Sequence, residues 1–326
     1  MISGDDQIWP LAGVGAVRYT ASISVVAIEA GGRVVSPGSG SELHVAFCGD
    51  ADVEVGLFAA ARSLLNHSSR PVTLHILTDL RSGISRQRFT AAFGKRAEIR
   101  HYDVDTRLFE GWCPLVGNRF AYSKLLIPDL IGADRILYLD TDTITDTDVW
   151  ELWNTPMAQA PLAAVKEARI GDSIEGRFLI GTGVAADANY YNAGVLLFNA
   201  AAWRRQGLTE RALRFAASHA ESLRTADQTV FNALLWRDIL ELDPRFNVRL
   251  WPTSDLSGIE RGRSILHFSG GLKPWDPLSS RLHSGFPVWS AYHDEDRAAR
   301  MSAPRRAVRC ARLWRYYWTA IKARWT

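Results

Sequence analysis

The chain is predicted to have an α/β fold built on a mainly parallel sheet, and three features of the sequence support this class. Short apolar segments typical of strands alternate with helical segments from residue 42 onward. Two of these strands run into acidic loops, as expected where ligands collect at the carboxyl ends of strands in an open sheet. The chain has 326 residues, of which 47% are hydrophobic and 22% charged, and this composition is sufficient for a buried core.

Each element follows from the spacing of its apolar residues and from the polar or glycine residues that interrupt it. Residues 53–66 carry Leu57, Ala61 and Leu64 at helical spacing. Residues 136–139 are apolar and run into two acids, which predicts a buried strand ending at a charged edge. Further strands are expected at 43–47, 72–77, 99–102, 162–165, 191–199 and 265–268, and further helices at 85–93, 121–127 and 226–235.

Cysteine usage and hydropathy indicate the cell compartment in which the protein is expected. Cys48, Cys113 and Cys310 are far apart and form no CxxC pair, so neither a zinc site nor a disulfide framework is predicted, and a reducing compartment fits best. No basic segment precedes an apolar one at the N-terminus, and no apolar run reaches the roughly 20 residues that cross a bilayer. We therefore expect a cytoplasmic protein, soluble or attached to a membrane surface.

Residues 304–326 differ sharply in charge from the rest of the chain. They hold seven of the 38 basic residues and none of the 35 acidic ones, which leaves residues 1–303 with 31 basic and 35 acidic side chains. As a helix, this tail would place Trp314, Trp318 and Trp325 on the face opposite its arginines, a pattern typical of binding to an anionic membrane. The alternative is a helix packed on the body with solvated charges. No nucleic-acid partner is expected, because the body lacks a basic excess.

Asp140 and Asp142 form the central candidate site. Two carboxylates two residues apart after a strand face one point if the chain leaves the regular pleat there. Such oxygen ligands suit Mg²⁺ or Mn²⁺, which also keep waters and substrate phosphates as ligands. The alternative is a solvated turn. The apolar residues 136–139, which form a predicted buried strand directly before the two acids, favour the metal site.

Two further segments carry candidate functional residues. His267 ends a predicted strand and is followed by Gly270 and Lys273, which would bring backbone N–H groups and a point charge to a phosphate, although a lone histidine is more often structural. Asp227 and Gln228 begin a predicted helix, where they would bind sugar hydroxyls or cap the helix. From spacing alone the helix cap is favoured.

Taken in order along the chain, these motifs resemble glycosyltransferase family 8, whose members are retaining enzymes. The resemblance runs from about His44 to Trp275. Each motif is only modestly specific, but six of them occur in the order of the family. The matching segments are residues 44–50, 122–128, 136–142, 191–199, 227–228 and 267–275.

The resemblance implies a GT-A fold: a single Rossmann-like domain with a mixed, mainly parallel central sheet flanked by helices. It also implies a UDP-sugar donor, a glycan or glycolipid acceptor such as lipopolysaccharide, and Mn²⁺ (or Mg²⁺). Residues 42–303 would form the catalytic domain and residues 304–326 a basic amphipathic helix at the inner face of the membrane. Residues 1–41 would be an extension of unknown role.

The family's functional residues carry over to matching positions of this chain. Asp140, Asp142 and His267 would ligate the metal, and Asp227 and Gln228 would be the catalytic pair, with Asp227 on donor hydroxyls and Gln228 on the sugar face opposite UDP. The other donor-binding residues implied by the resemblance are Asp50, Asp52, Lys124, Thr141, Asn192, Ala193, Gly194, Gly270 and Lys273.

Three departures from the family pattern concern donor identity. Lys124 stands where members often have arginine, so a bidentate contact becomes a point charge. Val53 replaces an aromatic residue of some members, and Lys166 and Glu167 replace an expected aspartate, for which Glu167 could substitute. Two alternatives stay open: a haloacid-dehalogenase-type phosphatase, whose nucleophile motif also contains Asp-x-Asp, and a non-catalytic sugar-nucleotide-binding module.

Overall fold

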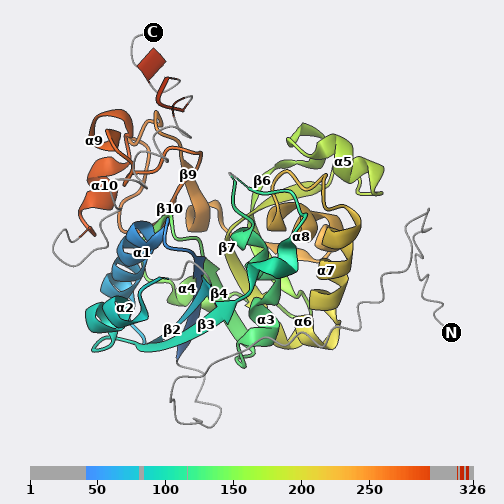
Figure 1. The fold of residues 1–326 in the computed structure, drawn as a ribbon, viewed down its shortest axis with the longest axis horizontal. Helices are drawn as coiled ribbons and strands as arrows, with labels where there is room; N and C mark the ends of the chain where they lie inside the picture. The colour runs from blue at the N-terminus through green and yellow to red at the C-terminus, as the bar shows by residue number, and fades with distance from the viewer. Residues whose placement is uncertain are drawn as a thin grey trace.

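The computed structural model of the chain describes residues 42–80, 84–115 and 117–293, with residues 314, 316–318 and 321–322 of the C-terminal segment (Figure 1). The predicted extension 1–41 and most of the predicted tail lie outside the described residues. Among the described residues, no helix has both the length and the apolar character that crossing a bilayer requires.

A seven-stranded sheet forms the centre of the molecule (Figure 1). Its strand order is β3-β2-β1-β4-β7-β6-β8. The first four strands run parallel, whereas β7 is antiparallel to both β4 and β6. The predicted mixed, mainly parallel sheet is therefore confirmed. The strands are β1 (Leu43–Gly49), β2 (Val72–Asp79), β3 (Glu98–Val104), β4 (Arg135–Leu139), β6 (Leu162–Arg169), β7 (Asn189–Asn199) and β8 (Ile239–Glu241).

Helices cover both faces of this sheet (Figure 1). A hydrophobic core lies on each face of the sheet, between the strands and one set of helices. Successive side chains of β4 point to opposite faces, so Leu137 and Leu139 pack with the first set of helices and Ile136 and Tyr138 pack with the second. The first set is α1 (Glu54–His67), α2 (Arg86–Phe93) and α4 (Trp150–Trp153), and the second is η2 (Phe120–Leu126), α3 (Ile127–Leu130), α6 (Ala200–Arg205), α7 (Leu208–Ser218) and α8 (Asp227–Leu235).

A second, three-stranded sheet follows the end of β4. It consists of β5 (Thr143–Asp146), β10 (Ser264–Phe268) and β9 (Val248–Leu250), in the order β5-β10-β9. β10 is antiparallel to β5 and parallel to β9. The remaining elements are α5 (Gly176–Gly181), α9 (Ser279–Leu282), α10 (Phe286–Ser290) and the short 3₁₀ turns η1 (Thr106–Phe109), η3 (Ile170–Asp172) and η4 (Pro244–Asn247).

Two predicted helices differ in detail from the structure. The segment predicted at 121–127 is the 3₁₀ helix η2, and α3 begins where Pro128, which has no backbone N–H, interrupts the hydrogen bonds. The helix predicted at 226–235 begins one residue later as α8. Ala226 precedes it at a φ of 51°, a left-handed conformation uncommon for alanine.

Candidate metal and donor site

The strand order reverses between β1 and β4, and the candidate residues lie at that point of the sheet. Asp140 directly follows β4, and Asp142 directly precedes β5. The N–H of Asp140 donates to the carbonyl of Gly194 on β7 at 2.8 Å, and the N–H of Phe268 donates to the carbonyl of Asp142 at 2.9 Å. The turn with the two aspartates is thus held by the large sheet on one side and the small sheet on the other.

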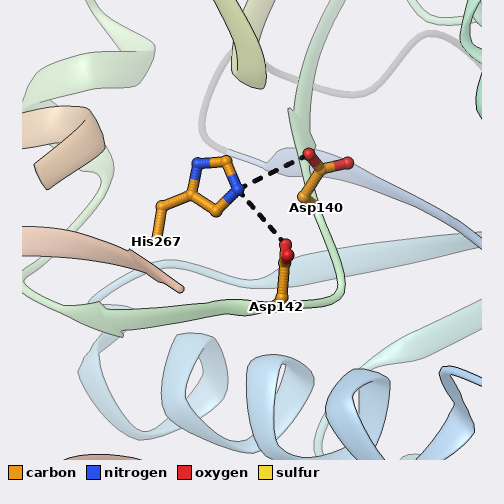
Figure 2. A group of neighbouring side chains, drawn as sticks. All are labelled: Asp140, Asp142 and His267. Atoms are coloured by element: carbon orange, nitrogen blue, oxygen red, sulfur yellow. Dashed lines mark ion pairs between the residues drawn. The ribbon is translucent and has the colours of Figure 1, made fainter. Parts of the chain in front are cut away.

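The pairing of β10 with β5 brings His267 to these aspartates. His267 lies opposite Thr143 in the register. Its Nε2 is 3.8 Å from Oδ2 of Asp140 and 3.4 Å from Oδ1 of Asp142 (Figure 2). Gly194 allows this approach, because a Cβ there would lie only 2.3 Å from Cε1 of His267. The three predicted metal ligands are therefore brought together from two segments of the chain, the turn between β4 and β5 and the strand β10.

The donor atoms of this cluster fit a divalent cation. Oδ1 of Asp140 contacts Lys124 and accepts a hydrogen bond from the Tyr138 hydroxyl. Oδ2 of Asp142 accepts a hydrogen bond from Lys273 at 2.5 Å. The other oxygen of each carboxylate faces His267. Both separations from Nε2 are shorter than twice a metal–ligand bond of about 2 Å. Two carboxylate oxygens and one imidazole nitrogen form a donor set that suits Mn²⁺ better than Mg²⁺.

Lys273 lies in the loop after β10 and supplies positive charge beside Asp142. Its Nζ also donates to the carbonyl of Phe268 at 2.7 Å, which fixes the side chain. Burial opposes ionisation of Asp142, but the neighbouring Lys273 and His267 outweigh it, so the pKa of this carboxyl lies below its ordinary value. In the same loop Gly270 has a φ of 91°, a conformation that favours glycine.

Lys124 lies on the other side of Asp140 and is 5% exposed. Its Nζ is 3.0 Å from Oδ1 of Asp140 and 3.0 Å from Oδ2 of Asp227, and it donates to the carbonyl of Ala193 at 3.1 Å. Burial would lower the pKa of Lys124, but the two carboxylates raise it. Burial raises the pKa of Asp227 to about 6, and Lys124 offsets this only in part.

This arrangement corrects the sequence-based preference for a helix cap at Asp227. Ala226 occupies the cap position and has no capping side chain. Asp227 is the first residue of α8, and its carboxylate pairs with Lys124 instead. The acid is used for a buried ion pair, which local spacing does not reveal.

Hydrogen bonds join Asn192 and Gln228 to Glu167. Asn192 Nδ2 donates to Oε2 of Glu167 at 2.9 Å, and Gln228 Nε2 donates to the same oxygen at 3.2 Å. Gln228 Oε1 accepts the N–H of Ala193 at 3.0 Å. Glu167 also pairs with Arg249 at 2.5 Å. The predicted residues from β7 and α8 are therefore joined in one polar network.

Asp50 and Asp52 lie at the same edge of the sheet, on the loop after β1. The N–H of Asp52 donates to Oδ1 of Asp50 at 2.9 Å, and Asn118 donates to Oδ2 of Asp50. Burial raises the pKa of Asp50. The loop reaches the aspartate turn near Thr141, whose Cγ2 lies 3.4 Å from the position of a Cβ at Gly49. Within the described ranges, neither Asp50 nor Asp52 bonds to the three-residue cluster.

Three residues of this region were not predicted from the sequence. Asn247 accepts from Nδ1 of His267 at 2.9 Å, Tyr138 bonds to Asp140, and Arg249 pairs with Glu167. Tyr138 looked like a core residue of β4, and it is 1% exposed. Asn247 and Arg249 come from η4 and the three-residue strand β9, which are too short to produce a periodic pattern.

Comparison with known proteins places the chain in a class of enzymes. The model of the family described as Glycosyl transferase family 8 matches residues 44–278, and the chain belongs to this family. It is therefore a glycosyltransferase that uses a nucleotide-sugar donor, which decides against the phosphatase and the non-catalytic module.

Individual relatives and solved structures match most of the chain. General stress protein A of Bacillus subtilis is 28% identical over 257 residues, which are 72% of this chain and 87% of that protein. Lipopolysaccharide 1,2-glucosyltransferase of Escherichia coli K12 is 26% identical over 252 residues, 72% of each chain. The structure of the galactosyltransferase LgtC with donor and acceptor sugar analogues aligns with a TM-score of 0.66 and 22% identity over 81% of this chain and 99% of that one. This last similarity confirms the GT-A fold.

Proposed function

We propose that the chain transfers a hexose from a UDP-sugar to a glycan or glycolipid acceptor, with retention at the anomeric carbon and with Mn²⁺. The observation that carries this proposal is the convergence of Asp140 Oδ2, Asp142 Oδ1 and His267 Nε2 between two lysines. When bound there, the cation would neutralise the diphosphate of the donor and act as a Lewis acid for the departing UDP.

The lysines would perform different parts of the reaction. Lys273 lies in the same loop as Gly270, so its ammonium would approach a phosphate oxygen as negative charge develops on UDP. Stabilisation that grows in the transition state lowers the barrier. Lys124 lies between Asp140 and Asp227, the carboxylate that would bind donor hydroxyls. It would therefore orient the sugar side of the donor.

The remaining predicted residues would contact other parts of the donor. Gln228 would lie on the sugar face opposite UDP, and its amide is a poor covalent nucleophile, which favours attack by the acceptor from the leaving-group face. Asp50, Asp52 and Thr141 would contact the nucleoside end. Asn192, Ala193 and Gly194 would line the sugar. Asn192 bonds to Glu167, Ala193 bonds to Gln228 and Lys124, and Gly194 bonds to Asn192.

A panel of UDP-sugars incubated with and without Mn²⁺ tests this proposal. We expect Mn²⁺-dependent release of UDP with at least one hexose donor, and no release by the Asp142→Ala variant above background. Equal release with a metal chelator present would contradict the metal requirement. The E. coli relative acts on lipopolysaccharide according to its name, so a lipopolysaccharide core is the first acceptor to test.

For the C-terminal segment we propose attachment to the anionic inner face of the cell membrane, outside the catalytic domain of residues 42–303. In its described part, Trp314 is 60%, Trp318 54% and Ile321 37% exposed, and the Lys322 ammonium lies 5.4 Å above the Trp318 ring. Exposed tryptophans beside basic groups suit a membrane interface. Deletion of residues 304–326 is expected to abolish sedimentation with anionic liposomes. Unchanged sedimentation of the truncated protein would refute this attachment.

A further inference from the structure

A line of hydrogen-bonded side chains leads from the Glu167–Arg249 ion pair to the ring of His267. Asn192 Nδ2 donates to Glu167 at 2.9 Å, Asn247 Nδ2 donates to Asn192 Oδ1 at 2.8 Å, and His267 Nδ1 lies 2.9 Å from Asn247 Oδ1. These residues come from β6, β7, η4 and β10. The line therefore connects the large sheet to the small one directly behind the candidate metal site.

The direction of these hydrogen bonds is determined at Asn192. The backbone N–H of Gly194, which can only donate, bonds to Oδ1 of Asn192 at 2.9 Å. The carboxylate of Glu167, which pairs with Arg249, can only accept, and it faces Nδ2 of Asn192. Both neighbours demand the same orientation of the Asn192 amide, so its Oδ1 must face Asn247.

The orientation of Asn192 determines that of Asn247 and then the protonated nitrogen of His267. Asn247 must present its NH₂ group to Asn192 Oδ1, which leaves its carbonyl oxygen facing Nδ1 of His267. A hydrogen bond between these two atoms requires the proton on Nδ1. Asn247 is 4% and His267 7% exposed, so water has little access to replace either partner.

We propose that Asn247 is a positioning residue that holds the neutral ring of His267 in the tautomer with the proton on Nδ1. Nε2 then carries the lone pair, and Nε2 is the atom that faces Asp140 and Asp142. In the other tautomer a proton would occupy the position through which the ring binds a cation. This inference rests on the proposed function, because it gives the hydrogen-bond line a role only if His267 is a metal ligand.

The tautomer can be observed directly in the metal-free protein. Long-range ¹H–¹⁵N spectra of ¹⁵N-histidine-labelled protein at about pH 9, more than two units above the ordinary histidine pKa, distinguish Nδ1–H from Nε2–H. We expect Nδ1–H at His267, with the signal assigned by its absence in His267→Gln. Asn247→Asp keeps an acceptor and should keep Nδ1–H, whereas Asn247→Leu should lose it. Nε2–H in the wild-type protein would overturn the proposal.

Metal affinity provides the second readout. Loss of the hydrogen-bond partner of a ligating histidine typically lowers metal affinity by about 10- to 100-fold. Asn247→Leu should therefore bind Mn²⁺ that much more weakly, as measured by electron paramagnetic resonance of the free ion. Asn232→Leu is the matched control, because Asn232 is a buried amide bonded to Tyr191 and Gln228 but not to His267. We expect its Mn²⁺ affinity to equal that of the wild type.

The two readouts separate this inference from the proposed function. Equal Mn²⁺ affinity of wild type and Asn247→Leu would overturn the positioning role while leaving the metal site intact. If the wild-type protein bound no Mn²⁺, the proposed metal requirement would fail, and the spectrum of His267 alone would decide the tautomer. A folded Asn247→Asp protein makes the spectrum informative even if Asn247→Leu does not fold.

Discussion

The two carboxylates Asp142 and Asp227 lie on opposite sides of the site, and although both are buried, their pKa values are shifted in opposite directions. Asp142, beside the small sheet, has a side chain 14% exposed, and Lys273 and His267 both approach it. Asp227, at the start of α8, is 2% exposed and shares Lys124 with Asp140. The pKa of Asp142 is lowered, whereas that of Asp227 is raised to about 6.

The difference shows that the neighbours of each carboxylate, and not burial alone, decide the direction in which its pKa is shifted. Asp142 stays ionised, as a metal ligand and phosphate-side residue must. Asp227, with its raised pKa, takes up a proton more readily, as suits a group that exchanges hydrogen bonds with sugar hydroxyls. Environments that push two pKa values apart are typical of acids with different roles in one site.

The largest expected effect is the loss of activity in Asp142→Asn. Removing a metal ligand should lower kcat/KM for UDP release by about 10³-fold, or about 4 kcal/mol, because the charge on departing UDP loses its stabilisation. Asp227→Asn keeps hydrogen-bonding atoms and should lose only about 10-fold, mainly in KM for the donor. Initial rates at saturating Mn²⁺ measure both. A larger loss in Asp227→Asn would reverse the roles assigned to the two acids.

The next effect concerns stability on the Lys124 side. Lys124→Met leaves Asp140 and Asp227 buried without their shared cation, which should cost about 3 kcal/mol of unfolding free energy at pH 8. The loss should shrink at pH 5, where Asp227, with its raised pKa, takes up a proton. Urea denaturation at both pH values measures this. Lys124→Arg, which keeps the charge, is the control, and a loss independent of pH would contradict the account.

The two acids should also give stability profiles of opposite slope. The folded-state pKa of Asp227 is about 6 against an ordinary 3.8, so its contribution is full below pH 4 and declines as pH rises through 6, by roughly 3 kcal/mol at most. The folded-state pKa of Asp142 is depressed, so its contribution is present above pH 4 and declines on further acidification. Unfolding free energies of Asp227→Asn and Asp142→Asn relative to wild type, measured from pH 3 to 8, should show these opposite trends.

A smaller effect is expected where the two sides meet, at Gly194. In Gly194→Ala the new Cβ would lie 2.3 Å from Cε1 of His267, so the ring must shift. We expect a loss of about 1–2 kcal/mol in stability, typical of overpacking, and weaker Mn²⁺ binding. Thermal unfolding and Mn²⁺ titration measure the two effects. Wild-type affinity in this variant would show that the ring has room to move.

The sequence predicted the long elements and the aspartate turn because their patterns are local. β1, β2, β4 and β7 are rich in apolar residues, and Asp140 and Asp142 follow one of them directly. The role of His267 depended on its resemblance to the family, since the pairing of β10 with β5 joins segments more than a hundred residues apart.

The small sheet, Asn247 and the ion pair of Asp227 were not predicted, because they depend on contacts between segments that are far apart in the sequence. β5, β8 and β9 have three or four residues each, too few for a periodicity, so the small sheet was not predicted. Asn247 is an ordinary turn residue in sequence, and only the meeting of η4 with β7 and β10 places it between Asn192 and His267. Asp227 resembled a helix cap because its partner, Lys124, is distant in the chain.

The most direct test of the central claim is anomalous scattering at the manganese edge from crystals grown with Mn²⁺ and UDP. The account predicts one strong peak among Asp140 Oδ2, Asp142 Oδ1 and His267 Nε2, with a diphosphate oxygen as a further ligand. A structure with UDP bound and no anomalous peak among these three atoms would contradict it.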